Sequence, residues 1–401
     1  MTTMDSTNYR CFAPCPRGLE SVLRQELDDL GCTVVEETEG GVSFRGRLEV
    51  VYRVNLESRI ASRILLELNQ VAYRSEQDVY AAAFAVPWTE WFVPSRTMKV
   101  KVSARRCPLP SLDFLTLRIK DAVCDKFLRI AKSRPSVDTR RPDIRIDAFL
   151  DPTHVTLYLD TSGEPLFKRG FRRAHVEAPL RENLAAGLLR LAGWNGTQPF
   201  LDPLCGSGTI AIEAALLARR MAPGWGRSFA FENFVSFDAH LWQTVRAASQ
   251  ARQLSRSPVR IAASDYDSRS VQIAGDHMRE AGVSSDIALS QQEIGDVIPS
   301  SDSGIVVTNP PYGIRLESQA GLDEFYPRLG QWMKQRCVGW HVYVLTGDLR
   351  LPKLIGLAPV RRIPLYNGAI ECRLYAFPIV RGSMRKHPLS PSTDSRNVPI
   401  Q

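Results

Sequence analysis

Residues 199–220 read PFLDPLCGSGTIAIEAALLARR. The order is a strand-like run that ends near Asp202, a short loop containing Gly206 and Gly208, and an apolar helix over 210–220. Glycines let a loop backbone approach a bulky ligand, and the amides at a helix N-terminus are free to bind it. The stretch therefore predicts a ligand-binding strand–loop–helix unit in an α/β domain.

The residues around this loop restrict which classes of ligand it could bind. Thr209 follows the last glycine where a P-loop needs Lys, which disfavours a nucleoside triphosphate. Gly206, Gly208 and Ala211 satisfy the dinucleotide fingerprint, but small residues are common at such turns, and the acid expected about 20 residues on is absent. Instead Asp265 ends a second strand, 260–264, and a carboxylate there can accept hydrogen bonds from ribose hydroxyls.

Two further acidic residues belong to this interpretation. A helix N-cap is the alternative role for Asp265, although Asp267 is better placed to cap the helix that begins near Ser268. Glu293 follows a third strand-like segment, 287–290, and is a candidate for contact with an adenine ring. Together these positions predict an adenosine-containing ligand.

The strand 304–308 runs directly into Asn309-Pro310-Pro311-Tyr312-Gly313. Two prolines stiffen the loop and remove amide donors, so it presents the Asn309 side-chain carbonyl and the Pro310 backbone carbonyl as acceptors. Two such acceptors could orient a planar exocyclic amine for attack on an electrophilic sulfonium methyl group, with Tyr312 stacking on the base. A strand-end turn stiffened by prolines is the alternative, and the upstream glycine loop disfavours it.

Cysteine and charge distributions restrict the class of protein. The eight cysteines are scattered without paired metal-binding clusters, and Cys205 is best interpreted as a small buried residue, so covalent catalysis on a pyrimidine ring is disfavoured. The net charge is +8, and residues 95–145 contain fourteen Lys or Arg against five Asp or Glu. This segment predicts a nucleic-acid partner, and a solvated helix face is the alternative.

Neither a secretory signal nor a membrane-spanning apolar run is visible, which predicts a cytoplasmic protein. The scattered cysteines predict no metal site, and no obligate protein partner is expected. The first third alternates short strands and helices in an α+β pattern, with a long helix over 111–131. From residue 180 onward, helices alternate with continuously apolar strands, which predicts a buried parallel sheet. The segment 161–179 is interpreted as a linker because Gly, Pro and basic residues interrupt the pattern.

Several longer motifs resemble the THUMP-domain guanine N2-methyltransferases that act on ribosomal or transfer RNA. They are FAPCPRGLESVLRQEL (12–27), TSGEPLFKRGFR (161–172), APLRENLAAGLL (178–189), LDPLCGSGTIAIEAA (201–215), TNPPYGIRL (308–316) and LYNGAIEC (365–372). The resemblance implies a C-terminal Rossmann-like class I methyltransferase domain, preceded by α+β ferredoxin-like and THUMP RNA-binding domains. The implied divisions are a ferredoxin-like unit (1–55), a THUMP domain (56–165), a linker (166–179) and the methyltransferase domain (180–381). Residues 382–401 are polar and rich in Ser, Pro and Arg, which predicts a disordered tail.

The resemblance also implies S-adenosyl-L-methionine as the cofactor and structured RNA as the substrate, 23S rRNA first and tRNA next. By position, Asp202, Gly206, Gly208 and Asp265 resemble the cofactor-binding residues, and Asn309, Pro310 and Tyr312 resemble the catalytic amine site. Glu293 stands where the family more often has Asp, which leaves its adenine contact open. Some relatives carry a second methyltransferase domain, and the sequence ends before one, so a single modification is expected.

Three alternatives remain open from the sequence. The same acceptor loop would serve adenine N6 methylation of DNA, although the basic N-terminal half favours RNA. Protein glutamine methylation would leave the basic segment without a role. A noncatalytic RNA-binding or assembly factor would not need the Asn309–Tyr312 loop.

Overall fold

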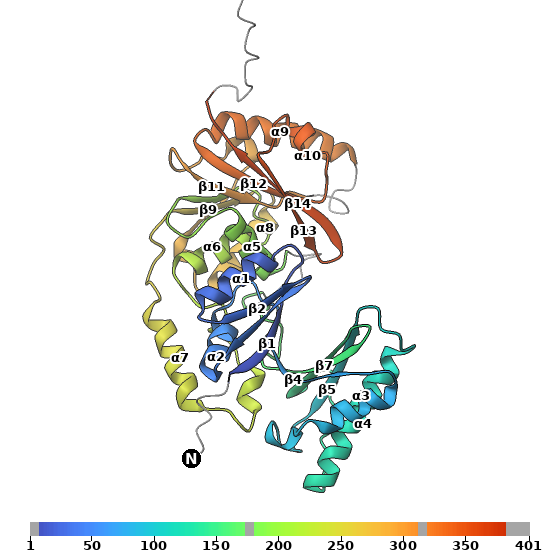
Figure 1. Cartoon of the computed structure of the whole chain (residues 1–401). Helices are drawn as coiled ribbons and strands as arrows, with labels where there is room; N and C mark the ends of the chain where they lie inside the picture. The colour runs from blue at the N-terminus through green and yellow to red at the C-terminus, as the bar shows by residue number, and fades with distance from the viewer. Residues whose placement is uncertain (1–7, 173–179, 312–318, 382–401) are drawn as a thin grey trace, which may run out of the picture.

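The computed structural model describes residues 8–172, 180–311 and 319–381. Within these residues the strands form two seven-stranded sheets, one in each half of the chain (Figure 1). The first has the order β2-β3-β1-β4-β7-β6-β5, and the second has the order β10-β9-β8-β11-β12-β14-β13.

The N-terminal half is built from β1 to β7 and α1 to α4. The bounds are β1 Tyr9–Pro14, α1 Glu20–Asp29, β2 Thr33–Thr38, β3 Gly41–Gly46, α2 Leu48–Glu57, β4 Leu65–Ala72, α3 Glu76–Ala85, β5 Met98–Ala104, α4 Leu112–Ala131, β6 Ile144–Leu150 and β7 His154–Asp160, with a short 3-10 turn at Trp88–Glu90. The predicted long helix is confirmed, and the Ser111 hydroxyl caps it by accepting from the Phe114 amide. The α+β expectation for this half therefore holds.

Pairing of β1 with β4 makes one continuous sheet of the whole N-terminal half. Strands β1 to β3 and strands β4 to β7 would otherwise form two separate small sheets. In Figure 1, β4, β5 and β7 with α3 and α4 form a lobe that projects from the rest of the molecule. The strands of this lobe thus continue the sheet of the ferredoxin-like unit.

The C-terminal half contains the second sheet. Its elements are α5 Glu182–Leu191, β8 Phe200–Asp202, α6 Thr209–Ala218, α7 Ala239–Ala251, β9 Ile261–Asp265, α8 Ser268–Glu280, β10 Ile287–Gln291, β11 Gly304–Thr308, α9 Gln319–Arg336, β12 Trp340–Thr346, α10 Leu351–Ile355, β13 Arg361–Asn367 and β14 Ile370–Pro378, with 3-10 turns at Ala230–Asn233, Ser284–Asp286 and Ile294–Asp296. Strands β10, β9, β8, β11 and β12 are parallel, and β14 is antiparallel to β12. The predicted buried parallel sheet is confirmed, since every residue of β11 is buried.

The parallel order brings three strand ends to one edge of the sheet. Strands β9, β8 and β11 are neighbours, and they end at Asp265, Asp202 and Thr308. Ligands of open α/β sheets bind at the carboxyl ends of the strands, where loops from neighbouring strands meet. The edge formed by these three residues is therefore where a site is expected.

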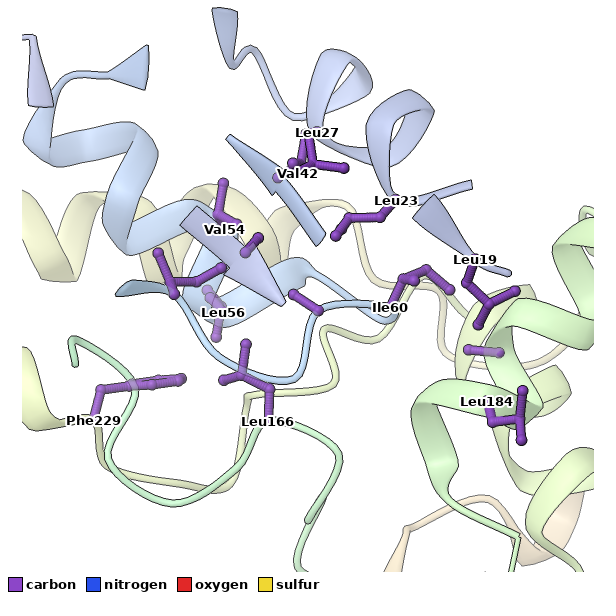
Figure 2. Packing of buried hydrophobic residues seen from close by; sticks show 14 of the residues in the cluster. Leu19, Leu23, Leu27, Val42, Val54, Leu56, Ile60, Leu166, Leu184 and Phe229 are labelled. Carbon is purple, nitrogen blue, oxygen red and sulfur yellow. The ribbon is translucent and has the colours of Figure 1, made fainter. Parts of the chain in front are cut away.

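The two halves share one apolar core. Figure 2 shows Leu19, which immediately precedes α1, close to Leu184 of α5, together with buried side chains of the ferredoxin-like unit. A Cβ atom added at Gly187 would lie 2.3 Å from Cδ1 of Leu19, so the Leu19 side chain fills the space over this glycine and would have to move to admit a side chain there. The ferredoxin-like unit is consequently packed directly onto the C-terminal half.

The described part of the segment interpreted as a linker contributes several buried side chains. Leu166, Arg169 and Phe171 are 2%, 8% and 4% exposed, and Leu166 belongs to the shared core in Figure 2. The segment therefore packs between the halves, at least as far as residue 172. Residues 173–179 and the predicted tail, 382–401, lie outside the described residues.

Two other expectations concern cysteine chemistry and membranes. All eight cysteines are free thiols, and Cys205 is 7% exposed, in agreement with its interpretation as a small buried residue. Within the described ranges, we find no cluster of three or more metal-ligating side chains. No helix in the same ranges combines the length and apolarity needed for a bilayer crossing.

Candidate active site

The loop between β8 and α6 has the left-handed backbone that its glycines predict. Gly206 has φ +52° and Gly208 has φ +80°, a region that costs other residues conformational energy. A Cβ atom at Gly208 would lie 3.1 Å from Cβ of Ala274 on α8, which leaves little room for a side chain. The loop is thus held close to α8.

Asp265 connects the end of β9 to this loop. Its Oδ2 accepts the Gly206 amide at 2.8 Å, and its Oδ1 accepts the Asp267 amide at 3.1 Å. Burial raises the pKa of Asp265, while these backbone donors lower it. Each carboxylate oxygen retains a second lone pair, so the group can still accept from a ligand hydroxyl. Asp267, as predicted, caps α8 by accepting from the amides of Arg269 and Ser270.

Asp202 connects the end of β8 to the end of β11. Its Oδ1 accepts the Thr308 hydroxyl at 2.8 Å, and the Leu204 amide lies 3.4 Å from the same oxygen. The carboxyl is 1% exposed, and burial raises its pKa to about 7, with the Asp265 charge adding to the increase. The loop after β8 and the loop after β11 are therefore tied together through buried polar groups.

Asn309 follows Thr308 and carries an unused acceptor. Its Oδ1 is buried, and it has no hydrogen-bond partner within the described ranges. A buried carbonyl without a donor costs on the order of 1–3 kcal/mol, so it is expected at a position where a ligand supplies the donor. Pro310 is buried beside it, and the carbonyl of Pro311 accepts the Tyr326 hydroxyl at 3.3 Å. Tyr312, the predicted stacking residue, lies outside the described residues.

Glu293 lies apart from these contacts. It is exposed at the start of the 3-10 turn after β10, and its Oε2 is 3.4 Å from Nη2 of Arg328 on α9. No contact joins it to Asp202, Asp265 or Asn309 in the described part of the chain. The structure therefore brings together the glycine loop, the two aspartates and the acceptor loop, and it leaves Glu293 on the surface.

Arg172, which sequence reasoning assigned only to a linker, supports the first turn of α6. Its Nη2 donates to the Thr209 hydroxyl at 2.9 Å and to the Leu180 carbonyl at 3.0 Å, and its Nε is 3.3 Å from Oε1 of Glu182. From α8, Nδ1 of His277 contacts the Ser207 carbonyl at 3.1 Å. The basic TSGEPLFKRGFR motif was the available signal for Arg172; no local pattern singled out His277.

One turn further along α6, Glu213 is fully buried in an ion cluster. Its Oε1 is 3.1 Å from Nε of Arg169, and its Oε2 is 3.7 Å from Nη1 of Arg59. Arg59 follows α2, so this cluster joins the ferredoxin-like unit, the connecting segment and the helix that begins at the glycine loop.

A parallel sheet with a glycine loop, an acid at the next strand end and an Asn-Pro-Pro acceptor loop defines a Rossmann-like methyltransferase domain. Comparison with known families agrees with this class. Residues 169–376 match the family model described as "RMKL-like, methyltransferase domain", residues 10–65 match the RlmL ferredoxin-like domain, and residues 73–160 match the THUMP domain. The chain belongs to the RMKL-like methyltransferase family, in its form with ferredoxin-like and THUMP domains, and the methyl donor of this family is S-adenosyl-L-methionine.

Individual relatives cover nearly all of the chain. A ribosomal RNA large subunit methyltransferase K/L of Syntrophotalea carbinolica is 39% identical over 380 residues, which cover 92% of this chain and 53% of the relative. The chain thus spans about half the length of that protein. A Synechocystis sp. protein named as a candidate RNA methyltransferase is 34% identical and matches 94% of this chain and 98% of its own length.

A solved structure shows the same arrangement of domains. The candidate methyltransferase SMU.472, crystallised with SAH, is 29% identical, with a TM-score of 0.86 over 94% of this chain and 100% of that one. The ferredoxin-like, THUMP and methyltransferase order is therefore common to both proteins.

Proposed function

We propose that this chain is an S-adenosylmethionine-dependent RNA methyltransferase that transfers methyl to the exocyclic N2 of a guanine in structured RNA, with 23S rRNA the first candidate and tRNA the next. The observation that carries the proposal is the buried Oδ1 of Asn309 just after β11, which has no hydrogen-bond partner among the residues that the structure describes. Asn309 follows Thr308, whose hydroxyl donates to Asp202 at the end of the neighbouring strand β8. An RNA substrate places the activity in the cytoplasm.

The residues at the strand ends fit the methyl donor. The backbone at Gly206 and Gly208 leaves the loop without side chains, and Asp265 retains acceptor capacity for ribose hydroxyls. Asp202 is an additional buried acceptor on the same edge. When bound here, S-adenosylmethionine supplies an electrophilic methyl group on sulfur.

We infer that the acceptor loop orients the nucleophile, which is the exocyclic amine of the substrate base. The lone pair of an exocyclic base amine is delocalised into the ring, so the amine needs positioning and charge stabilisation to attack. The Asn309 side chain and the Pro310 carbonyl each accept one amine hydrogen, which points the lone pair at the methyl carbon and stabilises the positive charge that develops on nitrogen. Tyr312 holds the base by stacking.

The test is Asn309→Ala in the full 401-residue chain, with the exposed Gln292→Ala as the control. We expect methyl transfer to RNA to fall about 10²–10³-fold, the cost of losing one aligned acceptor, while RNA affinity changes less than about twofold. Equal loss of transfer and RNA affinity would mean that the amine site is elsewhere. Gln292→Ala should retain both.

The substrate class is tested separately with tritiated methyl donor on rRNA, tRNA and duplex DNA, followed by mass spectrometry of the digested nucleosides. N2-methylguanosine is the expected product. Label in DNA alone would identify adenine N6 methylation of DNA, since the same loop can orient any planar amine. RNA binding without label in any substrate would identify a noncatalytic RNA-binding factor.

A further inference from the structure

The hairpin of β13 and β14 extends beyond the carboxyl edge of the second sheet. Strand β12 ends at Thr346, which pairs with Arg373, whereas the hairpin continues to its last pair, Asn367 with Ile370. Three further residues of β14 therefore lie past the end of β12, a projection of about 10 Å at about 3.3 Å per residue. Figure 1 shows this hairpin in red, projecting from the second sheet beside the ferredoxin-like unit.

The stem of the hairpin is fixed by the core and by the ferredoxin-like unit. Cys372 of β14 is fully buried. A Cβ atom added at Gly18 would lie 2.5 Å from the Pro364 carbonyl oxygen, so the loop before α1 lies directly against β13. The guanidinium carbon of Arg17 in the same loop is 4.5 Å from the centroid of the Tyr366 ring, a cation–π contact. Contacts from both halves of the chain therefore hold the stem in place.

The tip of the hairpin is tight, uncharged and exposed. Its two-residue loop is Gly368-Ala369, and Gly368 has φ +65°, as the first loop position of a type II′ turn requires. A Cβ atom added at Gly368 would meet no atom within 4 Å. Ile370 lies on the same face of β14 as the buried Cys372, yet it is 47% exposed. The hairpin thus presents an aliphatic side chain to solvent at the end of a stiff arm.

Isolated exposed apolar residues are common on protein surfaces, so the place of Ile370 relative to the acceptor loop decides its interpretation. By the register of β11, β12 and β14, Asn309 lies level with Leu374. Ile370 is therefore about 13 Å further along the strands and two strand spacings, about 10 Å, to the side, which separates the two residues by roughly 16 Å. A nucleotide that turns by about 180° around its backbone moves its base by on the order of 10–15 Å. Ile370 consequently lies where the base stack would be when a turned-out base occupies the Asn309 site.

The buried acceptor at Asn309 requires such a movement of the base. Its Oδ1 is buried, so an amine inside a stacked and paired helix cannot reach it. Enzymes that act on such a base take it out of the stack and lose its stacking energy. An apolar side chain inserted between the neighbouring bases recovers part of that energy and keeps the gap from closing.

We propose that Ile370 is a substrate-positioning residue, which fills the gap in the RNA stack when the target base turns out toward Asn309. The choice of RNA rests on the proposed function. The contact of Arg17 with Tyr366 keeps the arm stiff, so that the isoleucine can enter between two bases instead of folding back. The insertion breaks stacking contacts and no covalent bond.

Binding of the full chain to a fluorescent 16-base-pair RNA duplex tests this proposal, with and without one abasic nucleotide at the centre of the duplex. The abasic gap is already open, so the wild type should bind it at least about fivefold more tightly than the intact duplex. Ile370→Ala should reduce this preference to less than about twofold, whereas Ile370→Leu should retain it. Contacts to the backbone cancel in the ratio of the two affinities, because both duplexes carry the same phosphates.

The matched control is Leu349→Ala. Leu349 is 57% exposed in the loop after β12, but its carbonyl accepts the Tyr375 hydroxyl at 3.5 Å, so it lies back along β14 from the tip. This variant should keep the wild-type preference. Equal affinity of the wild type for both duplexes, an unchanged preference in Ile370→Ala, or the same loss in Leu349→Ala would each overturn the proposal.

Methyl transfer separates this proposal from the proposed function. On 23S rRNA, Ile370→Ala should lower the single-turnover rate at least about tenfold at unchanged S-adenosylmethionine affinity, since β11 and β12 separate β14 from β8. Label in RNA with an unchanged rate in this variant would overturn the role of Ile370 and preserve the RNA methyltransferase. Label in DNA alone, with an Ile370-dependent preference for an abasic DNA duplex, would preserve the role of Ile370 and reject the RNA methyltransferase.

Discussion

Glu213→Gln should destabilise the folded chain strongly, because this residue is the counter-ion of two buried arginines. The side chain of Glu213 has no exposure, and those of Arg169 and Arg59 are only 3% and 10% exposed. Arg59 also donates to the Leu216 carbonyl at 3.1 Å, so it cannot turn toward solvent without losing that bond. Burial lowers the pKa of Arg59 to about 10, and the Glu213 charge opposes this decrease.

The magnitude follows from leaving charge uncompensated. Glutamine preserves the size of the side chain and one acceptor oxygen, but both guanidinium groups would remain buried without a carboxylate. Breaking a buried pair in this way costs about 3–5 kcal/mol. The cluster also holds α6, which begins at the glycine loop, so affinity for S-adenosylmethionine should fall together with stability.

Urea unfolding of the full chain measures the decrease in the free energy of unfolding, with Glu371→Gln as the control. Glu371 lies 2.6 Å from Arg373 but is 53% exposed, so its pair should contribute no more than about 1 kcal/mol. If Glu213→Gln lowered the free energy of unfolding as little as Glu371→Gln does, the reasoning would be refuted. That result would mean that Arg59 and Arg169 are solvated or neutralised by other groups.

Three further outcomes test the site. Gly208→Ala should weaken S-adenosylmethionine binding at least about tenfold by calorimetry, whereas Gly193→Ala, with φ +72° and open space around it, should suffer only the backbone strain of about 1–2 kcal/mol. Burial raises the pKa of Asp202 to about 7, so the folded state binds an extra proton between about pH 4 and pH 7 and wild-type stability decreases with pH there. Asp202→Asn should therefore gain stability relative to the wild type across that window, and a pH-independent difference in urea midpoints would contradict the buried assignment. Tyr326→Phe removes the donor to the Pro311 carbonyl and should lower kcat about tenfold at unchanged cofactor affinity, a split that simple misfolding would not give.

The architecture of the C-terminal half could be predicted from local patterns. Continuous apolar runs such as 304–308 indicate strands buried on both faces, and glycine after a strand end indicates a tight turn into a helix. Ser111 and Asp267 could likewise be predicted as helix caps from the sequence, because a cap depends on the residue and its near neighbours. These features involve contacts within a few residues, where the order of side chains nearly determines the geometry.

Longer-range features needed the tertiary structure. Residues 161–172 look like a linker by composition, yet Arg169 and Arg172 support α6 from there, which no local pattern indicates. The structure places Glu293 on the surface beside Arg328, and its predicted contact with an adenine ring stays a prediction.

The sequence by itself determined the strand–loop–helix units, the helix caps and the residue types available at the strand ends, because these depend on neighbours along the chain. Only the tertiary structure decided that Thr308 bonds Asp202, that Gly206 bonds Asp265, and that the Asn309 side-chain carbonyl is buried with no partner among the described residues. Those relations join segments up to 106 residues apart. They depend on strand order and packing, and a linear pattern of residues does not contain that order.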